Sequence, residues 1–301
     1  MSPFLKVLNK NSAKRFYNAL LVFSSYYLSK IFHVEPFGVP ISLSIEPTTA
    51  CNLGCPECPS GLKKFTRDTG NLKTENLSKW LQDIEQKLWY INFYFQGEPF
   101  IHKDILDQIK WANTRGIYTS TSTNAHFIDE ELARKIVESK LDQLIISLDG
   151  VTQTVYEKYR INGNLEAVLR GTKNIIQAKR NVQSKLPHVV FQFLVVSHNE
   201  HQIEEAKSLA SEMGVDEIRF KTAQVYDFEN GNKLIPKNEK YSRYKKSSSG
   251  KWVIKNKLEN HCWRMWSGSV ITWNGLVVPC CFDKDAKHQL GDLKKSRFLE
   301  I

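Results

Sequence analysis

From residue 41 onward, short strand-like apolar runs alternate with amphipathic stretches of helical period, and this alternation constrains the fold most strongly. The strand candidates are 41–46, 90–96, 117–123, 144–149, 189–196 and 217–221. The helix candidates between them are 74–88, 103–114, 129–139, 165–179 and 200–213. Repeated β–α units join parallel strands through right-handed crossovers. We therefore predict an α/β fold, a partial (β/α)6 TIM-like barrel whose active site lies at the C-terminal ends of its strands.

Three cysteines, Cys51, Cys55 and Cys58, follow the first predicted strand with the spacing C-x3-C-x2-C. Three thiolates on one loop can hold three irons of a [4Fe–4S] cube and leave the fourth iron open to a small molecule. Gly54 and Pro56 keep this stretch from forming a regular helix, so we expect a loop.

Structural zinc or inert thiols are the alternatives for this cluster. Zinc sites usually combine C-x2-C pairs with two further ligands. Here the first spacing is three, and His33 and His102 are remote in sequence. The spacing therefore favours an iron–sulfur cluster.

Composition is that of an ordinary soluble protein, with 41% hydrophobic and 25% charged residues in 301 positions. The net charge is +10, with much of the excess in the N-terminal segment and in 232–257. No basic stripe interleaved with aromatic residues indicates nucleic-acid binding. Cysteines grouped at metal-type spacing favour a reducing compartment, so we expect a cytoplasmic protein.

The first 40 residues contain a basic amphipathic stretch that is too short and too polar to span a membrane. One helical face would carry Phe16, Leu20, Phe23 and Tyr27. We expect this face to dock on the barrel, with contact to a membrane surface as the alternative. Four basic residues at or before its start should remain in solvent: Lys6, Lys10, Lys14 and Arg15.

The C-terminal part begins with an irregular, partly exposed connector at 230–260 and continues with a second cysteine group. This group is Cys262, Cys280 and Cys281. Residues 270–277 read as a hairpin with Asn274 and Gly275 in its tight turn, which would bring Cys262 and Cys280 together. Two buried thiols and one bystander would be the alternative.

The cysteine motif, together with four further elements near successive strand ends, resembles the radical SAM superfamily. Gln96-Gly97-Glu98-Pro99 is similar to its G-G-E-P element, and Ser122-Thr123-Asn124 stands where the family often has T-N-G. The other two elements are Ser147-Leu148-Asp149-Gly150 and the following Arg160. The resemblance implies these S-adenosylmethionine (SAM) contacts: Gln96, Gly97, Glu98, Asn124, Ser147, Asp149 and Arg160. Two residues depart from the pattern, because Glu57 stands where an aromatic residue is usual and Gln96 replaces a glycine.

The tail resembles the opening of the SPASM or twitch extension of radical SAM enzymes, since Cys262, Gly275 and Cys280 form a C-x(9–15)-G-x4-C pattern. The resemblance implies an auxiliary [4Fe–4S] cluster held by Cys262, Cys280 and Cys281. A full SPASM domain has more cysteines downstream, so we expect the sequence to be truncated at Ile301.

Together these features predict an N-terminal amphipathic segment at 1–38, a radical SAM core at 39–225 and a linker with a partial SPASM-like extension at 226–301. The resemblance implies a radical enzyme that uses a [4Fe–4S] cluster and SAM and receives electrons from a flavodoxin- or ferredoxin-like donor. Its substrate would be a peptide or protein side chain or a small metabolite. No acid–base pair or nucleophile identifies the bond that is changed. The rival hypothesis is a non-catalytic iron–sulfur or zinc protein for electron transfer or scaffolding.

Overall fold

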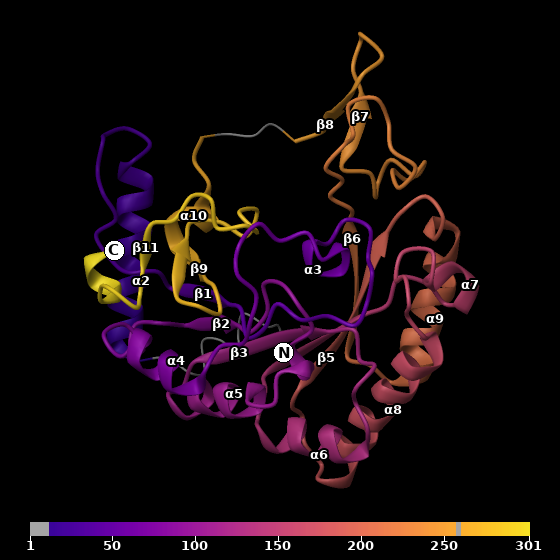
Figure 1. Ribbon diagram of the computed structural model, residues 1–301, viewed down its shortest axis with the longest axis horizontal. Coiled ribbons are helices and arrows are strands. Elements are labelled where there is room, and N and C mark those ends of the chain that lie inside the picture. The colour runs from indigo at the N-terminus through magenta and orange to yellow at the C-terminus, as the bar shows by residue number, and fades with distance from the viewer. Residues whose placement is uncertain (1–11, 257–259) are drawn as a thin grey trace.

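The computed structural model describes residues 12–256 and 260–301, and its centre is a nine-stranded sheet (Figure 1). The strand order is β11-β10-β9-β1-β2-β3-β4-β5-β6. Strands β1 to β6 are parallel, and β9 adds a further parallel neighbour to β1. The bounds are β1 Ser42–Ile45, β2 Tyr90–Asn92, β3 Tyr118–Thr123, β4 Gln143–Ser147, β5 His188–Val195, β6 Glu217–Thr222, β9 Gly268–Ile271, β10 Leu276–Val278 and β11 Gly291–Asp292.

Helices cover the outer face of this curved sheet, as expected of a partial barrel (Figure 1). The predicted β–α alternation is confirmed, although the second strand is shorter than 90–96 and the first barrel helix ends as regular helix at Leu81. The helices are α2 Ala13–Leu28, α3 Pro59–Leu62, α4 Thr74–Leu81, α5 Ile105–Thr114, α6 Glu130–Glu138, α7 Gln153–Tyr156, α8 Leu165–Asn181, α9 Ile203–Met213 and α10 Trp263–Ser267. Short 3-10 turns are η1 Pro99–Ile101, η2 Glu200–Gln202 and η3 Phe298–Glu300.

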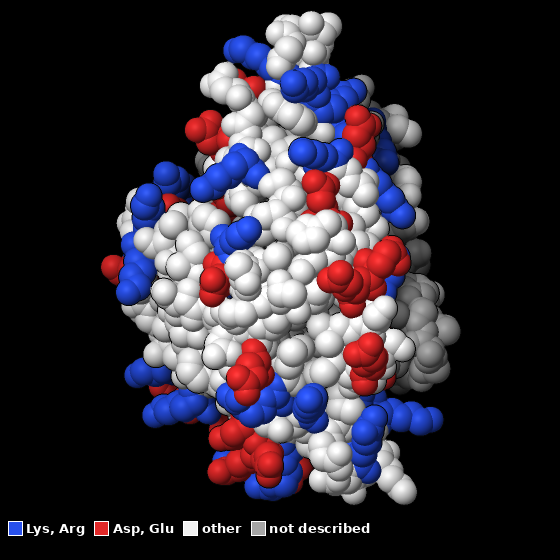
Figure 2. Space-filling model, turned by 90° about the vertical axis from the view of Figure 1, so that its right-hand side faces the viewer, with Lys and Arg blue, Asp and Glu red and all other residues white. Residues whose placement is uncertain are grey.

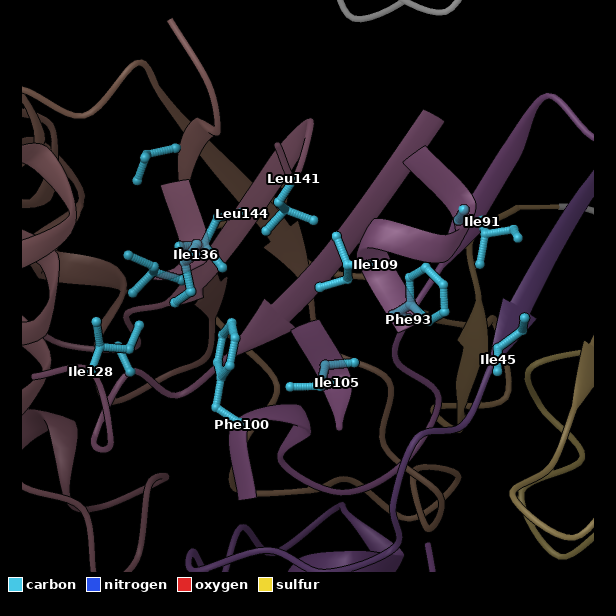
Figure 3. Close-up of a cluster of buried hydrophobic side chains, with 14 of the residues drawn as sticks. Ile45, Ile91, Phe93, Phe100, Ile105, Ile109, Ile128, Ile136, Leu141 and Leu144 are labelled. Atoms are coloured by element: carbon cyan, nitrogen blue, oxygen red, sulfur yellow. The ribbon is translucent and has the colours of Figure 1, made fainter. Parts of the chain in front are cut away.

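The main hydrophobic core lies between the sheet and its covering helices. Ile91 and Phe93 pack there with Ile105 and Ile109 from α5, and all four are buried (Figure 3). The side chains that line a cavity on the other face of the sheet include Ser42, Ser44 and Asn92. Alternation along each strand thus builds an apolar outer layer and a partly polar barrel interior.

The N-terminal segment forms a helix, but the prediction of which helix face packs against the barrel was wrong. The side chains that α2 buries are Arg15, Asn18, Val22 and Ser25, whereas Phe16, Leu20, Phe23 and Tyr27 are at least half exposed. The underlying surface offers backbone carbonyls, which a polar face satisfies better than an apolar one. Lys14 is exposed as predicted, whereas Arg15 is buried; Lys6 and Lys10 lie outside the described residues.

The connector is more ordered than predicted. It contains a two-stranded antiparallel hairpin formed by β7 Tyr244–Lys246 and β8 Trp252–Ile254. Leu234, Ile235 and Tyr244 are buried with Cys55 in one hydrophobic cluster, so the connector covers the cysteine loop. Figure 2 shows charges of both signs intermixed on the side of the molecule that it presents. Among the described helices, none has the length and apolar character needed to cross a membrane.

Candidate active site

The first cysteine group lies on the loop that leaves the C-terminal end of β1. Cys55 is buried, and Cys51 and Cys58 are half-buried. The Cys58 amide donates to the Cys55 carbonyl at 3.2 Å, which folds the loop back on itself before α3 begins. Gly61 allows the close approach of α3, since a Cβ there would stand 2.6 Å from the Cys55 nitrogen.

A structural zinc site takes four converging ligands, whereas a [4Fe–4S] cube takes one thiolate per iron. In 12–256 and 260–301, no group of three His, Cys, Asp or Glu side chains is arranged to hold a single metal ion. The preference for an iron–sulfur cluster at Cys51, Cys55 and Cys58 rests on their spacing in the sequence.

Burial opposes ionisation of two of these thiols. The pKa of Cys51 is raised to about 11, mainly by burial and also by the neighbouring Glu98, Cys55 and Cys58. Burial also raises the pKa of Cys55, which the Arg160 guanidinium partly offsets. A metal centre would have to displace these protons when it binds.

The loop after β2 packs directly against the cysteine loop. Gly97 has φ of +79°, and a Cβ there would lie 2.3 Å from the Thr48 carbonyl oxygen, so only glycine fits. The Gly97 amide donates to Ser60 Oγ at 2.9 Å, and the Glu98 amide donates to the Ala50 carbonyl at 2.7 Å. These backbone contacts fix the G-E-P element beside the cysteines.

The Glu98 carboxylate is only 2% exposed and is held by its own chain. It accepts hydrogen bonds from Thr123 Oγ1 at 2.6 Å, the Asn124 amide at 2.7 Å and the Phe100 amide at 3.2 Å. A carboxylate has about four acceptor sites, so roughly one is left. Burial raises the Glu98 pKa, and these hydrogen bonds oppose that rise.

Asn124, at the end of β3, joins two parts of the site. Its backbone contacts Glu98, and its side-chain Nδ2 donates to Asn52 Oδ1 in the cysteine loop at 2.7 Å. Asn52 was not among the predicted site residues. Its position directly after Cys51 is the only sequence signal that could have identified it.

Asp149 and Arg160 form a buried ion pair next to Cys55. Arg160 Nε donates to Asp149 Oδ2 at 2.5 Å, and the other Asp149 oxygen accepts from the Leu194 amide at 2.7 Å. Arg160 also reaches the Cys55 sulfur at 3.7 Å. In this structure Asp149 therefore orients Arg160, and Arg160 faces the cysteine loop.

The remaining predicted contacts lie around the same loop. Gln96 is buried, and its Oε1 stands 3.9 Å from the Cys58 sulfur, so the residue that replaces a glycine reaches a cysteine. Ser147 is buried at the end of β4. Glu57 Oε2 accepts from the Tyr226 amide at 3.2 Å, which ties the cysteine loop to the chain beyond β6.

The second cysteine group lies next to β9 and β10. Cys280 and Cys281 follow β10 and lie toward the N-terminal end of β1, whereas the first group leaves the C-terminal end of β1. The predicted hairpin is present, since β9 and β10 pair antiparallel and Gly275 has φ of +91° in the turn. Burial raises the pKa of Cys280, and the adjacent Cys281 and Cys262 raise it further, so the three thiols are electrostatic neighbours. Cys280 and Cys281 line the same cavity of about 420 Å³.

Comparison with protein families identifies the family to which this fold belongs. The model of the radical SAM superfamily matches residues 45–210, which hold the cysteine loop and the strand-end elements. This chain belongs to the radical SAM superfamily. The model of the SPASM iron–sulfur cluster-binding domain matches 262–301, beginning at Cys262. The cofactors of the superfamily are a [4Fe–4S] cluster and SAM, and SPASM domains bind auxiliary iron–sulfur clusters.

Two curated proteins illustrate the sequence similarity of this radical SAM chain to its relatives. The mycofactocin maturase MftC of Mycobacterium tuberculosis is 30% identical over 176 residues, which are 58% of this chain and 43% of the relative. The PqqA peptide cyclase of Bradyrhizobium diazoefficiens is 26% identical over 193 residues, 64% of this chain and 49% of the relative. The chain thus spans about half the length of the curated relatives that it matches.

Solved structures share the fold at low sequence identity. SuiB of Streptococcus suis, bound to S-adenosylmethionine, has a TM-score of 0.65 and 16% identity, covering 87% of this chain and 65% of SuiB. The protein anSMEcpe with bound AdoMet has a TM-score of 0.59 and 18% identity, covering 87% of this chain and 80% of anSMEcpe.

Proposed function

We propose that this chain is a SPASM-type radical SAM enzyme that modifies a peptide, with its primary cluster at Cys51, Cys55 and Cys58. The observation that carries the proposal is the meeting of this loop with Gly97, Asn124 and Arg160 at the C-terminal ends of parallel strands. In barrels of this kind, that edge is where active sites lie.

The residues present fit the two cofactors. Three thiols on one folded loop can ligate three irons and leave the fourth for SAM. A spare acceptor site on Glu98 suits an ammonium group, and the Arg160 guanidinium suits a carboxylate. When bound, the cluster and SAM would supply a 5′-deoxyadenosyl radical able to abstract a hydrogen atom from the substrate, with one electron taken from an external donor and methionine as the leaving group.

The role of the protein's own residues is to position the cysteine loop and to shield it from water. Gly97 lets the strand-end loop lie against the cysteine loop, while Asn52 and Asn124 link that loop to β3. Leu234 and Tyr244 of the connector pack around Cys55 and keep water from it. Exclusion of water protects a reactive intermediate from side reactions.

A peptide is the substrate class that we favour. One relative is named a PqqA peptide cyclase, and one solved neighbour is SuiB bound to the precursor peptide SuiA. The interior cavity of about 420 Å³ is lined by polar groups of Ser42, Ser44 and Asn92, which can hydrogen-bond to a peptide backbone. We expect Cys262, Cys280 and Cys281 to hold auxiliary iron beside this cavity.

The test uses the anaerobically reconstituted chain with SAM, a strong reductant and deuterated candidate precursor peptides. We expect a mass change in the peptide and deuterium in the released 5′-deoxyadenosine. Deuterium transfer from a small metabolite but not from any such peptide would contradict the substrate class. The Cys51→Ala/Cys55→Ala/Cys58→Ala variant is the control, and it should give neither product.

A further inference from the structure

We propose that the exposed face of α2 binds the headgroup region of an anionic lipid bilayer, with the helix lying along the membrane surface. This inference is independent of the proposed reaction. The apolar face comprises side chains of α2 and of the chain just after it: Phe16, Tyr17, Leu20, Phe23, Tyr27, Leu28, Ile31, Phe32 and Phe37.

The side chains of this apolar face are exposed and contiguous, unlike the single apolar residues that are scattered over an ordinary protein surface. Phe16 is 63% exposed, Leu20 is 53% exposed and Phe23 is 51% exposed, and beyond the helix Ile31 is 76% exposed. Residues 16, 20, 23 and 27 recur at helical spacing and so form a continuous row. Helix α2 lies on the left-hand side of the molecule in Figure 1, and the exposed fractions of its side chains show that this row faces solvent. Contiguous exposed apolar patches mark interaction sites.

Polar contacts on the opposite face fix the helix in this orientation. Arg15 Nε donates to the Leu88 carbonyl at 2.6 Å, and Asn18 exchanges two hydrogen bonds with the Val39 backbone at 2.9 and 3.0 Å. Ser25 Oγ accepts from Trp266 Nε1 at 3.0 Å. Rolling the helix to bury its apolar face would break these buried bonds, so the apolar face is held outward.

The charge around this face is complementary to anionic lipid. Besides the buried Arg15, the sequence up to Val34 contains four Lys residues and no acidic residue, and Glu35 is the first acidic residue. Lys14 lies near the start of α2 and Lys30 just beyond its end, and both are exposed. A second copy docked on the same face would bring these cations together, which favours lipid over a dimer.

Length and composition indicate that α2 lies on the membrane surface. Sixteen helical residues extend about 24 Å, which is less than the roughly 30 Å hydrocarbon core. Aromatic and aliphatic side chains on one face with lysines at its margin are typical of interfacial helices.

The test is co-sedimentation of the full chain with phosphatidylcholine vesicles, with and without phosphatidylglycerol. We expect binding to the phosphatidylglycerol vesicles that falls at least about tenfold in Phe16→Ser/Leu20→Ser, since two exposed apolar side chains lose their insertion energy. Val182→Ser/Val253→Ser is the matched control, because it removes two exposed apolar side chains elsewhere, and its binding should be unchanged.

A charge variant tests the electrostatic part. Lys14→Glu/Lys30→Glu should weaken binding to phosphatidylglycerol vesicles at least about tenfold, and high salt should weaken wild-type binding. Lys110→Glu/Lys251→Glu makes the same charge change at exposed sites outside the apolar face and should bind more tightly than the first variant.

If something other than lipid covers the apolar face, the measurements should differ, and either of two such results would overturn the proposal. A second copy would appear as a dimer in sedimentation velocity that Phe16→Ser/Leu20→Ser dissociates, without vesicle binding. Coverage by residues 1–11 would make the same variant melt at a lower temperature without vesicles, again with no vesicle binding. We expect a monomer-like sedimentation unaffected by the variant and an unchanged melting temperature, because the side chains face solvent.

Discussion

Gly97 shows how one residue can join two loops of the site. A Cβ at this position would stand 2.3 Å from the Thr48 carbonyl, and φ is +79°. We predict that Gly97→Ala destabilises the fold by more than the roughly 1–3 kcal/mol of backbone strain alone and lowers the iron bound after reconstitution. Chemical denaturation and iron analysis measure the two effects.

Gly250 provides the matched control for this prediction. Its φ is +80°, but a Cβ there would have no neighbour within 4 Å. Gly250→Ala should therefore lose only the free energy of unfolding that backbone strain accounts for, and its iron content should be normal. Equal effects of the two substitutions would mean that the contact between Gly97 and Thr48 is unimportant.

The buried Asp149–Arg160 ion pair allows a second prediction about single residues. The Asp149 side chain is 1% exposed, so removing Arg160 leaves its buried charge with the Leu194 amide but without the paired cation. We predict that Arg160→Gln lowers the free energy of unfolding by about 3–5 kcal/mol. Asp149→Asn/Arg160→Gln should lose less than the sum of the single variants, because the unpaired charge is gone. Additive losses in chemical denaturation would contradict this coupling.

The sequence predicted which residues meet at the site better than it predicted what they do there. Glu98, Asp149 and Arg160 all lie beside the cysteine loop, but Glu98 and Asp149 are largely engaged by the chain itself. Their partners include the Asn124 and Leu194 amides, which are far away in sequence and carry no side-chain signal. Direct contacts to SAM stay predictions.

At the scale of elements, a buried ion pair ties the cysteine-bearing β1 loop to the C-terminal extension. Arg67 forms two hydrogen bonds with Glu46 at 2.6 and 2.9 Å and donates to the Lys284 carbonyl. We predict that Arg67→Met lowers the free energy of unfolding by about 3–5 kcal/mol, because the Glu46 side chain is fully buried. The more exposed Arg115–Glu85 pair is the control, and Arg115→Met should cost about 1 kcal/mol or less.

The same pair predicts a pH dependence. Burial raises the pKa of Glu46 above its ordinary value of 4.5, and Arg67 opposes that rise. Without Arg67 the pKa should rise further, so the folded state binds a proton that the unfolded state releases. The stability of Arg67→Met should then fall as the pH rises from about 4.5 toward neutrality, more steeply than that of the wild type. Parallel stability–pH curves for the two proteins would contradict this assignment.

Elements with a strong period were predictable, and the orientation of α2 was not. The alternation of strands and helices is repeated, so errors in single boundaries do not change the topology. For α2, amphipathic spacing predicts that the apolar row faces the core. The actual choice depends on carbonyl groups of Leu88 and Arg115, which only the assembled surface reveals.

At the scale of the whole molecule, two cysteine groups lie on one sheet and predict two iron sites. Reconstituted wild-type chain should bind more than about four irons, and Cys262→Ser/Cys280→Ser should fall to about four. Iron and sulfide analysis measures this, with visible absorption as an independent readout. Equal iron content in the two proteins would show that the tail thiols bind no cluster.

The central claim is that the loop of Cys51, Cys55 and Cys58 makes this chain a radical SAM enzyme. The most direct measurement is 5′-deoxyadenosine formation from SAM by anaerobically reconstituted protein with a strong reductant. We predict formation by the wild type and by Cys262→Ser/Cys280→Ser, and none by Cys51→Ala/Cys55→Ala/Cys58→Ala. Formation of 5′-deoxyadenosine by the triple variant, or none by the reconstituted wild type, would contradict the account.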